Sequence, residues 1–250
     1  MAGHTREAFS DATWDEFARR WERGDYRASF FRDMVLADVR RWGPRPSLLD
    51  IGCGRGLDGE PALQRSLAEW AGRYVGIEPD AAASVADCFA QIYRCPLEDA
   101  PLEPASIHVA MAVFVIEHVR CPRPFFGRIY EVLVEGGVFW CFTIDLRHGF
   151  ALASLLAEGL GMKQWCVDAA RAAGVRPHAD VYRTFYRANT PSAIRRYAGR
   201  FRSARFMNLH QAGQFDAYLP RWAHRCSHAL DRLGAALRLP GPMLVARLEK

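Results

Sequence analysis

A short apolar run, residues 48–51, leads directly into a glycine-rich loop at residues 52–56, and this junction constrains the fold most. An apolar run of this length that stops at a turn signal is typical of a buried strand. Glycine tolerates dihedrals and close contacts that a Cβ atom forbids, so the loop lets a ligand approach the main chain. The sequence therefore predicts a strand that ends at a ligand-binding loop.

A second apolar run, residues 74–77, ends at Glu78 and Pro79. An acid at the end of the next strand can accept hydrogen bonds from both hydroxyls of a ribose. Glu78 lies 22 residues after Gly56, close to the offset of roughly 20 residues that such a unit shows. Together the two runs predict a nucleoside-binding crevice.

The glycine spacing indicates which nucleoside the crevice takes. Dinucleotide sites carry G-x-G-x-x-G, with a pyrophosphate at the helix N-terminus. Here the pattern is Gly52-x-Gly54-x-Gly56, and the acids Asp58 and Glu60 follow. Acids at this place disfavour a pyrophosphate and favour a cationic ligand without phosphate, so an NAD-dependent reductase is disfavoured.

The D-I-G-C-G-x-G motif at Asp50, with the acid at Glu78, resembles the class I S-adenosylmethionine-dependent methyltransferases. The resemblance continues in order through residues 106–119, 128–137 and 138–144 and covers about residues 46–145. It implies S-adenosylmethionine as the cofactor. The cofactor contacts expected by this resemblance are Asp50, Gly52, Cys53, Gly54, Glu78, Pro79, Leu97, Glu98, Ala112 and Phe114.

Some of these contacts have structural alternatives. Asp50 is expected to orient the methionine end of the cofactor, or else to organise the loop without touching it. Ala112 either lines the floor of the crevice or packs in the core. Members of the family often place an acid where this chain has Pro96, so adenine recognition is expected to involve Leu97 and Glu98 instead.

The whole chain fits one α/β domain with insertions, because strand-like and helix-like segments alternate. We expect a doubly wound, Rossmann-like, mostly parallel seven-stranded sheet with helical insertions after strand 5 and before the last strand. The expected strands are residues 47–51, 74–77, 91–94, 107–113, 138–144, 204–209 and 243–248. The expected parts are an N-terminal helical cap (1–45), a cofactor-binding core (46–145), a helical lid (146–189) and a C-terminal completion of the sheet (190–250).

Helices are expected where apolar residues recur at three-to-four spacing. Residues 11–42 should form amphipathic helices broken near Gly24, and Thr190 followed by Pro191 should open another helix. Further helices are expected at residues 61–71, 81–89, 123–133, 150–162, 163–173, within 211–239, and at 191–201.

The candidate catalytic residue is His118, which follows the fourth strand. Histidine exchanges a proton near neutral pH, so His118 could act as general base at the mouth of the crevice. The alternative is a structural residue that opens the following helix. His148, Tyr182 and Tyr186 are the acceptor-site candidates in the lid.

Comparison with quinone O-methyltransferases, which the 117–118 segment resembles, gives an expectation about metal. Those enzymes carry an acid earlier in the segment and bind a divalent ion, whereas this chain has Phe114 at that position. We therefore expect no metal.

Charge is divided unevenly along the chain. Residues 1–145 carry a net charge of −6 and residues 146–250 a net charge of +11. The positive charge of residues 146–250 forms either a solvated face or a surface that recruits an anionic acceptor. The leading prediction is methyl transfer to an oxygen of an anionic or carrier-linked small molecule, with a nitrogen as the alternative atom.

Two alternatives from other classes stay open. The basic C-terminal part could serve an RNA methyltransferase, although the D/N-P-P-Y/F/W block of base-amino methyltransferases is missing after the fourth strand. A non-catalytic ligand-binding or membrane-surface protein is the other alternative, because a basic helix carries Trp222, Leu230, Leu233 and Leu237. The oligomeric state is left open.

A cytoplasmic location is expected from two features. Residues 1–16 are polar and do not resemble a secretory leader. The seven cysteines are scattered without a C-x-x-C pair, so we expect reduced core thiols.

Overall fold

A single seven-stranded sheet organises the chain in a computed structural model that describes residues 9–162, 164–165, 168, 182–211, 213, 216, 219 and 221–250. The strands are β1 (Ser47–Ile51), β2 (Arg73–Ile77), β3 (Gln91–Tyr93), β4 (Ile107–Val113), β5 (Leu133–Ile144), β6 (Ser203–Leu209) and β7 (Met243–Glu249). Their order is β3-β2-β1-β4-β5-β7-β6. Only β7 runs antiparallel to its neighbours, pairing Phe142 of β5 with Val245 and Met207 of β6 with Val245.

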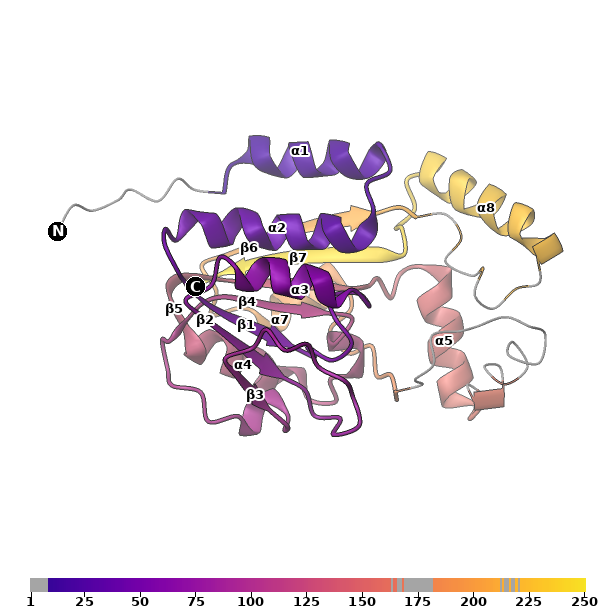
Figure 1. Ribbon diagram of the computed structural model, residues 1–250. Coiled ribbons are helices and arrows are strands. Elements are labelled where there is room, and N and C mark those ends of the chain that lie inside the picture. The colour runs from indigo at the N-terminus through magenta and orange to yellow at the C-terminus, as the bar shows by residue number, and fades with distance from the viewer. Residues whose placement is uncertain are drawn as a thin grey trace.

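Helices cover both faces of this sheet (Figure 1). On one face lie α1 (Asp11–Glu22), α2 (Arg27–Arg41) and α3 (Pro61–Ala68), and on the other lie α4 (Pro122–Val132) and α7 (Pro191–Tyr197). Adjacent strand residues point to opposite faces, so Leu48 belongs to the buried cluster under α2 and Leu49 to the one under α4. The doubly wound Rossmann-like fold is confirmed.

Two helices stand outside these layers. The insertion after β5 contains α5 (Gly149–Gly159), and the one before β7 contains α8 (Arg221–Ala236). Both lie at the same end of the molecule, away from the C-terminus (Figure 1). One-turn helices η1 (Leu97–Asp99) and η2 (Ile116–His118) follow β3 and β4. These positions agree with the two predicted insertions.

Local signals in the sequence account for several helix ends. The Ser10 hydroxyl accepts a 3.1 Å hydrogen bond from the Thr13 amide and caps α1. Gly24, with φ of +90°, separates α1 from α2, as predicted. The Thr190 hydroxyl accepts from the Ala193 amide at 3.1 Å and starts α7 at Pro191, also as predicted.

A buried ion pair fastens the N-terminal helices to the sheet. Asp38 of α2 is fully buried and accepts hydrogen bonds from Arg247 Nε of β7 at 2.7 Å and from Trp140 Nε1 of β5 at 2.9 Å. Arg247 is only 2% exposed. A charge at such a site is stable only with its partner, so this contact fixes how α2 lies on the sheet.

The prediction of a helix at residues 81–89 was wrong. This segment forms turns, and Val85 makes an isolated antiparallel bridge with Gly54. The Ser84 carbonyl accepts a 2.7 Å hydrogen bond from the Arg55 amide. The Ser84 carbonyl therefore accepts from the glycine loop, whereas in a helix it would accept from the amide four residues later. The helix expected at residues 163–173 lies mostly outside the described residues.

The expectation that the cysteines are core residues holds only in part. Cys53 and Cys141 are buried, whereas Cys121 and Cys226 are exposed. All six described cysteines are free thiols. In the described part of the chain, no helix is long and apolar enough to cross a membrane.

Candidate functional site

The glycine loop is held against the end of β2 by its own amides. The amides of Gly52 and Cys53 donate to the Ile77 carbonyl at 2.8 and 3.1 Å. Gly52 has φ of +75°, and a Cβ there would lie 2.4 Å from Val115 Cγ2. Only glycine therefore fits between the loop and the chain that leaves β4.

Glu78, directly after β2, is the acid that this loop surrounds. Its Oε2 accepts a 2.8 Å hydrogen bond from the Gly54 amide, and its Oε1 accepts a 3.0 Å bond from the Asp80 amide. A Cβ on Gly54 would lie 2.5 Å from Glu78 Oε2. The carboxylate is thus oriented by two main-chain donors and still reaches the surface of a cavity.

That cavity has a volume of about 480 Å³. It lies at the carboxyl ends of β1, β2 and β4, where ligands bind in doubly wound sheets. The lining residues are Gly52, Gly54, Arg55, Glu78, Pro79, Asp80, Ala83, Val113, Phe114, Val115, His118, Tyr182, Arg183 and Phe185. Five of the ten predicted cofactor contacts are among them, together with His118 and Tyr182.

Residues 182–186, called the lid segment below, bring Tyr182, Arg183 and Phe185 to the lining of this cavity. The Phe185 amide donates to the Glu117 carbonyl at 2.7 Å. The Tyr182 hydroxyl donates to Asp80 Oδ2 at 2.6 Å, which raises the pKa of Tyr182 to about 12 and lowers the pKa of Asp80. Two hydrogen bonds thus join the lid to the loops after β4 and β2.

His118 lies where the lid meets η2. Its Nδ1 is 2.8 Å from the Arg183 carbonyl oxygen. A carbonyl only accepts, so Nδ1 carries the proton and Nε2 of the neutral ring has the lone pair. The ring meets Tyr182 edge-on, with centroids 5.8 Å apart. The lid therefore fixes the tautomer that a general base at Nε2 would need.

Phe114 bends the chain at the end of β4 beside the cavity. Its φ is +54°, a left-handed conformation that costs energy for a bulky residue. The ring packs 6.2 Å from Phe31, and the Arg27 guanidinium lies 5.2 Å from it. Helix α2 thus supports this part of the cavity wall.

Asp50 and Cys53 are buried and do not line the cavity. Asp50 Oδ2 accepts hydrogen bonds from Gln64 Nε2 at 2.9 Å and from the Tyr74 hydroxyl at 3.0 Å. Burial raises the pKa of Asp50 to about 6, against those two bonds. Burial also raises the pKa of the Cys53 thiol, which packs against Gly76. Gln64 Nε2 also donates to the Cys53 carbonyl at 2.9 Å, so Asp50 is joined to the loop through Gln64.

Three other predicted cofactor contacts also lie away from the cavity. Leu97 and Ala112 are buried in the core cluster under α4, and Glu98 is exposed on η1. Leu97 lies there because η1 packs onto α4. None of these three residues lines the cavity.

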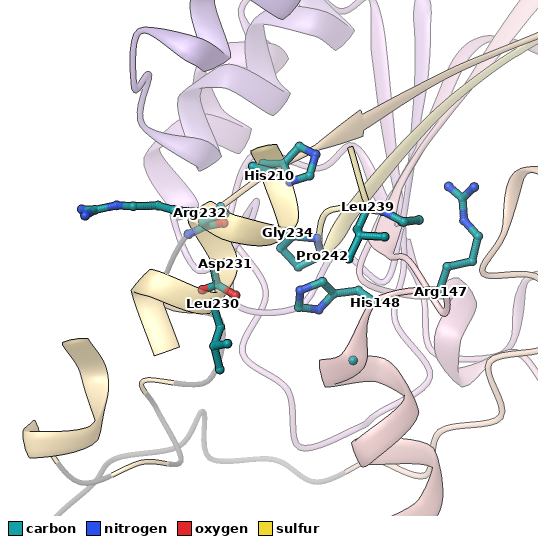
Figure 2. A pocket seen from close by; sticks show the side chains of 13 residues that line it. Arg147, His148, His210, Leu230, Asp231, Arg232, Gly234, Leu239 and Pro242 are labelled. Atoms are coloured by element: carbon teal, nitrogen blue, oxygen red, sulfur yellow. The ribbon is translucent and has the colours of Figure 1, made fainter. Parts of the chain in front are cut away.

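The remaining lid candidates separate from His118. Tyr186 is buried, with its amide 3.2 Å from the Glu117 carbonyl. His148 caps α5, its Nδ1 accepting from the Phe150 amide at 3.2 Å, and burial lowers its pKa. It lines a second cavity of about 370 Å³ between α5, α8 and the ends of β6 and β7 (Figure 2).

Several residues of the main cavity were missed by sequence reasoning. Arg55, Asp80, Arg183 and Phe185 line it. Arg183 and Phe185 belong to an aromatic, arginine-rich stretch, and that composition is the signal in the sequence that could have identified them. Asp58 and Glu60, in contrast, do not line the cavity, and both accept hydrogen bonds from residues at the start of α2. Arg27 Nε donates to Asp58 at 2.6 Å and the Tyr26 hydroxyl to Glu60 at 3.0 Å.

The residues present fit the adenosyl part of S-adenosylmethionine. Gly52 and Gly54 leave a hollow that a Cβ would fill, and Glu78 offers an oriented carboxylate for two ribose hydroxyls. Within the described residues, no three His, Cys, Asp or Glu side chains gather as a metal site would require. Fold and cavity together define a nucleoside-binding, doubly wound domain.

Comparison with known proteins gives this domain its family. Residues 49–141 match the methyltransferase domain family. The mouse mitochondrial ubiquinone biosynthesis O-methyltransferase is 32% identical over 173 residues, which are 61% of this chain and 45% of that protein. The chain spans about half the length of the curated relatives it matches.

Solved structures share the fold. A SAM-dependent methyltransferase from Archaeoglobus fulgidus matches with a TM-score of 0.54 and 12% identity, over 94% of this chain and 99% of its own. Geranyl diphosphate C-methyltransferase from Streptomyces coelicolor A3(2), solved with S-adenosyl-L-homocysteine, gives a TM-score of 0.53 with 14% identity, over 88% of this chain and 75% of its own. Residues 49–141 are therefore a methyltransferase domain of the S-adenosylmethionine-dependent, class I type, and S-adenosylmethionine is its cofactor.

Proposed function

We propose that this protein transfers a methyl group from S-adenosylmethionine to an oxygen of a small anionic acceptor. The observation that carries the proposal is the composition of one cavity. One wall holds the glycine loop and Glu78, and the other presents His118 and Arg183. The curated relatives are named as O-methyltransferases of ubiquinone biosynthesis, which supports oxygen as the acceptor atom.

The bound cofactor would supply an electrophilic methyl group next to a sulfonium. Glu78 would hold the ribose beside the glycine loop, and residues 182–185 cover the cavity. His118 Nε2 would take the proton that the acceptor oxygen loses as it is methylated. The protein thus contributes mainly alignment, exclusion of water and one proton acceptor.

The preference for an anionic acceptor rests on two guanidinium groups. Arg55 and Arg183 line the cavity on the loop and lid sides. The Arg183 side chain is 75% exposed, and its Nε is 4.0 Å from Glu158 Oε1, beyond hydrogen-bond distance. An acceptor carboxylate could replace this loose ion pair with a bidentate contact.

Calorimetry with S-adenosylhomocysteine tests the cofactor part, with NAD as the comparison ligand. Micromolar binding of the first alone is expected, and binding of neither or of both would contradict the proposal. Acceptor activity is then measured as transfer of a radiolabelled methyl group to hydroxybenzoates, with matched neutral phenols and aminobenzoates. Transfer confined to amines would refute an oxygen acceptor.

His118→Ala tests the proton acceptor. We expect kcat to fall by about 10²–10⁴-fold while affinity for S-adenosylhomocysteine stays within about twofold. His148→Asn is the matched control, because asparagine also caps a helix and His148 lines the second cavity. An unchanged kcat in His118→Ala would remove the base from the proposal.

A further inference from the structure

Helix α8 turns its apolar side chains outward. Trp222 is 81% exposed, Leu230 68% and Leu233 55%, and Leu237, just beyond the helix, 63%. Ser227 is the only buried residue of the helix. An amphipathic helix at a protein surface normally packs its apolar stripe on the core. Here the stripe faces solvent instead.

The exposed side chains form one continuous stripe. Trp222, Cys226, Leu230, Leu233 and Leu237 follow one another at spacings of four, four, three and four residues, which places them on one side of a helix. A helix of 16 residues is about 24 Å long. The stripe is therefore long enough to lie along a flat surface.

Basic side chains border this stripe. Arg221, Arg225 and Arg232 recur at spacings of four and seven and share the adjoining side of the helix. Among the residues that the structure describes, none of these guanidinium groups forms an ion pair with a carboxylate. Arg232 is one of the residues that line the second cavity, and in Figure 2 its side chain points away from His148. The charge beside the stripe is therefore available to an external anion.

Two acids lie at α8: Asp231 within it, and Asp216, whose Oδ2 is 2.6 Å from His228 Nε2. Asp231 is the only acid between residues 217 and 248. Its Oδ2 accepts a 2.8 Å hydrogen bond from the Gly213 amide, and the residue lines the second cavity. The one carboxylate of α8 thus faces the protein, and the outer surface is apolar and cationic.

Helix α5 adds apolar groups at the same end of the molecule. Leu152, Leu156 and Leu160 are 47%, 66% and 71% exposed and are four residues apart. Gly149 at the start of α5 and Leu230 of α8 line the same second cavity, and both helices lie at one end in Figure 1. The two insertions thus form a joint apolar end.

We infer that this end of the protein docks on a phospholipid bilayer rich in anionic headgroups, with α8 lying in the plane of the interface. An exposed apolar stripe with Trp and Leu, flanked by arginines, is the arrangement that binds such surfaces. Helix α8 has no acid on its outer side. Its surface therefore complements an anionic lipid better than a protein surface that carries charges of both signs. This inference concerns a surface separate from the cofactor cavity, so it goes beyond the proposed methyl transfer.

Co-sedimentation with large unilamellar vesicles tests the inference. We expect at least tenfold stronger binding to vesicles of 70% phosphatidylcholine and 30% phosphatidylglycerol than to pure phosphatidylcholine, with weakening in high salt. Leu230→Ser/Leu233→Ser should lower binding at least tenfold. Each of Arg225→Gln and Arg232→Gln should lower it by about fivefold.

Trp70→Ser is the matched control, because Trp70 is 43% exposed but lies at the end of α3. It should bind vesicles like the unaltered protein. Unchanged affinity of the α8 variants for S-adenosylhomocysteine shows that they still fold. Failure to bind anionic vesicles, or binding that the α8 changes leave intact, overturns the inference. So does a dimer in sedimentation velocity that Leu230→Ser/Leu233→Ser abolishes while vesicle binding is absent.

Discussion

The Tyr182 hydroxyl donates a 2.6 Å hydrogen bond to Asp80 Oδ2 across 102 positions of sequence. Asp80 lies two residues after Glu78, and Tyr182 lies in the lid segment beside His118. One contact therefore links the proposed ribose site to the proposed proton acceptor. It ties the segment that carries Tyr182 to the loop that orients Glu78.

Replacing Tyr182 by Phe tests this link. Loss of the hydrogen bond should raise the KM for the acceptor by about three- to tenfold with a smaller effect on S-adenosylhomocysteine binding. Tyr130→Phe, at the opposite end of the sheet near Lys250, is the control. Equal kinetics of the Tyr182 variant and the unaltered protein would contradict a role for this contact.

The same contact should resist a change of pH. The pKa of Tyr182 is raised to about 12 and that of Asp80 is lowered, in each case mainly by their hydrogen bond. A lowered folded-state pKa means that the stabilisation from Asp80 is present above its unfolded pKa and is lost as the pH falls through the folded value. The difference in KM between Tyr182→Phe and the unaltered protein should therefore stay constant from pH 7 to about 9.

Gly54→Ala should weaken cofactor binding without unfolding the protein. The added Cβ would lie 2.5 Å from Glu78 Oε2 and 3.0 Å from Ala83 Cβ, so the carboxylate must move from its position. We expect affinity for S-adenosylhomocysteine, measured by calorimetry, to fall by about tenfold or more. In Gly127→Ala of α4 the Cβ meets nothing within 4 Å, and this variant should bind normally.

Asp50→Asn should stabilise the fold at neutral pH. The folded-state pKa of Asp50 is raised to about 6 by burial, so its stabilising effect is complete below the unfolded pKa near 4 and is lost as the pH rises through about 6. A pKa shift of roughly two units corresponds to about 3 kcal/mol in the free energy of unfolding. The asparagine oxygen can still accept from Gln64 and Tyr74.

Denaturant unfolding of Asp50→Asn across pH 4–8 measures this effect. The variant should gain stability relative to the unaltered protein as the pH rises from 4 to 7. Asp99→Asn, an exposed change on η1, should show no such trend. A gain that does not depend on pH would mean that burial is not the cause.

Asp38→Ala should strongly destabilise the protein. The change leaves Arg247, 2% exposed, without its buried partner and Trp140 Nε1 without an acceptor. Breaking a buried pair in this way costs about 3–5 kcal/mol, measured as the free energy of unfolding in urea. Asp11→Ala breaks an exposed ion pair with Arg205 and should cost less than about 1 kcal/mol.

Much of the sheet could be predicted from the sequence, because its signals are local. The strand at residues 47–51 and the cap at Thr190 follow from apolar runs and turn residues that need no distant partner. The helix expected at residues 81–89 failed because the Ser84 carbonyl bonds to the Arg55 amide. That contact joins segments far apart in the chain, and no local pattern reports it. The four-part division of the chain stays a prediction.

The sequence by itself determined the glycine loop, the position of Glu78 and the family, since glycine spacing and strand-end acids are set residue by residue along one chain segment. Only the tertiary structure decided which side chains meet across the cavity. It left Asp50 and Cys53 out of the cavity lining, placed His148 in another cavity, and brought Tyr182 and Arg183 to His118. The outward stripe of α8 was also decided there, because the sequence gives a helix its apolar face but packing determines what that face meets.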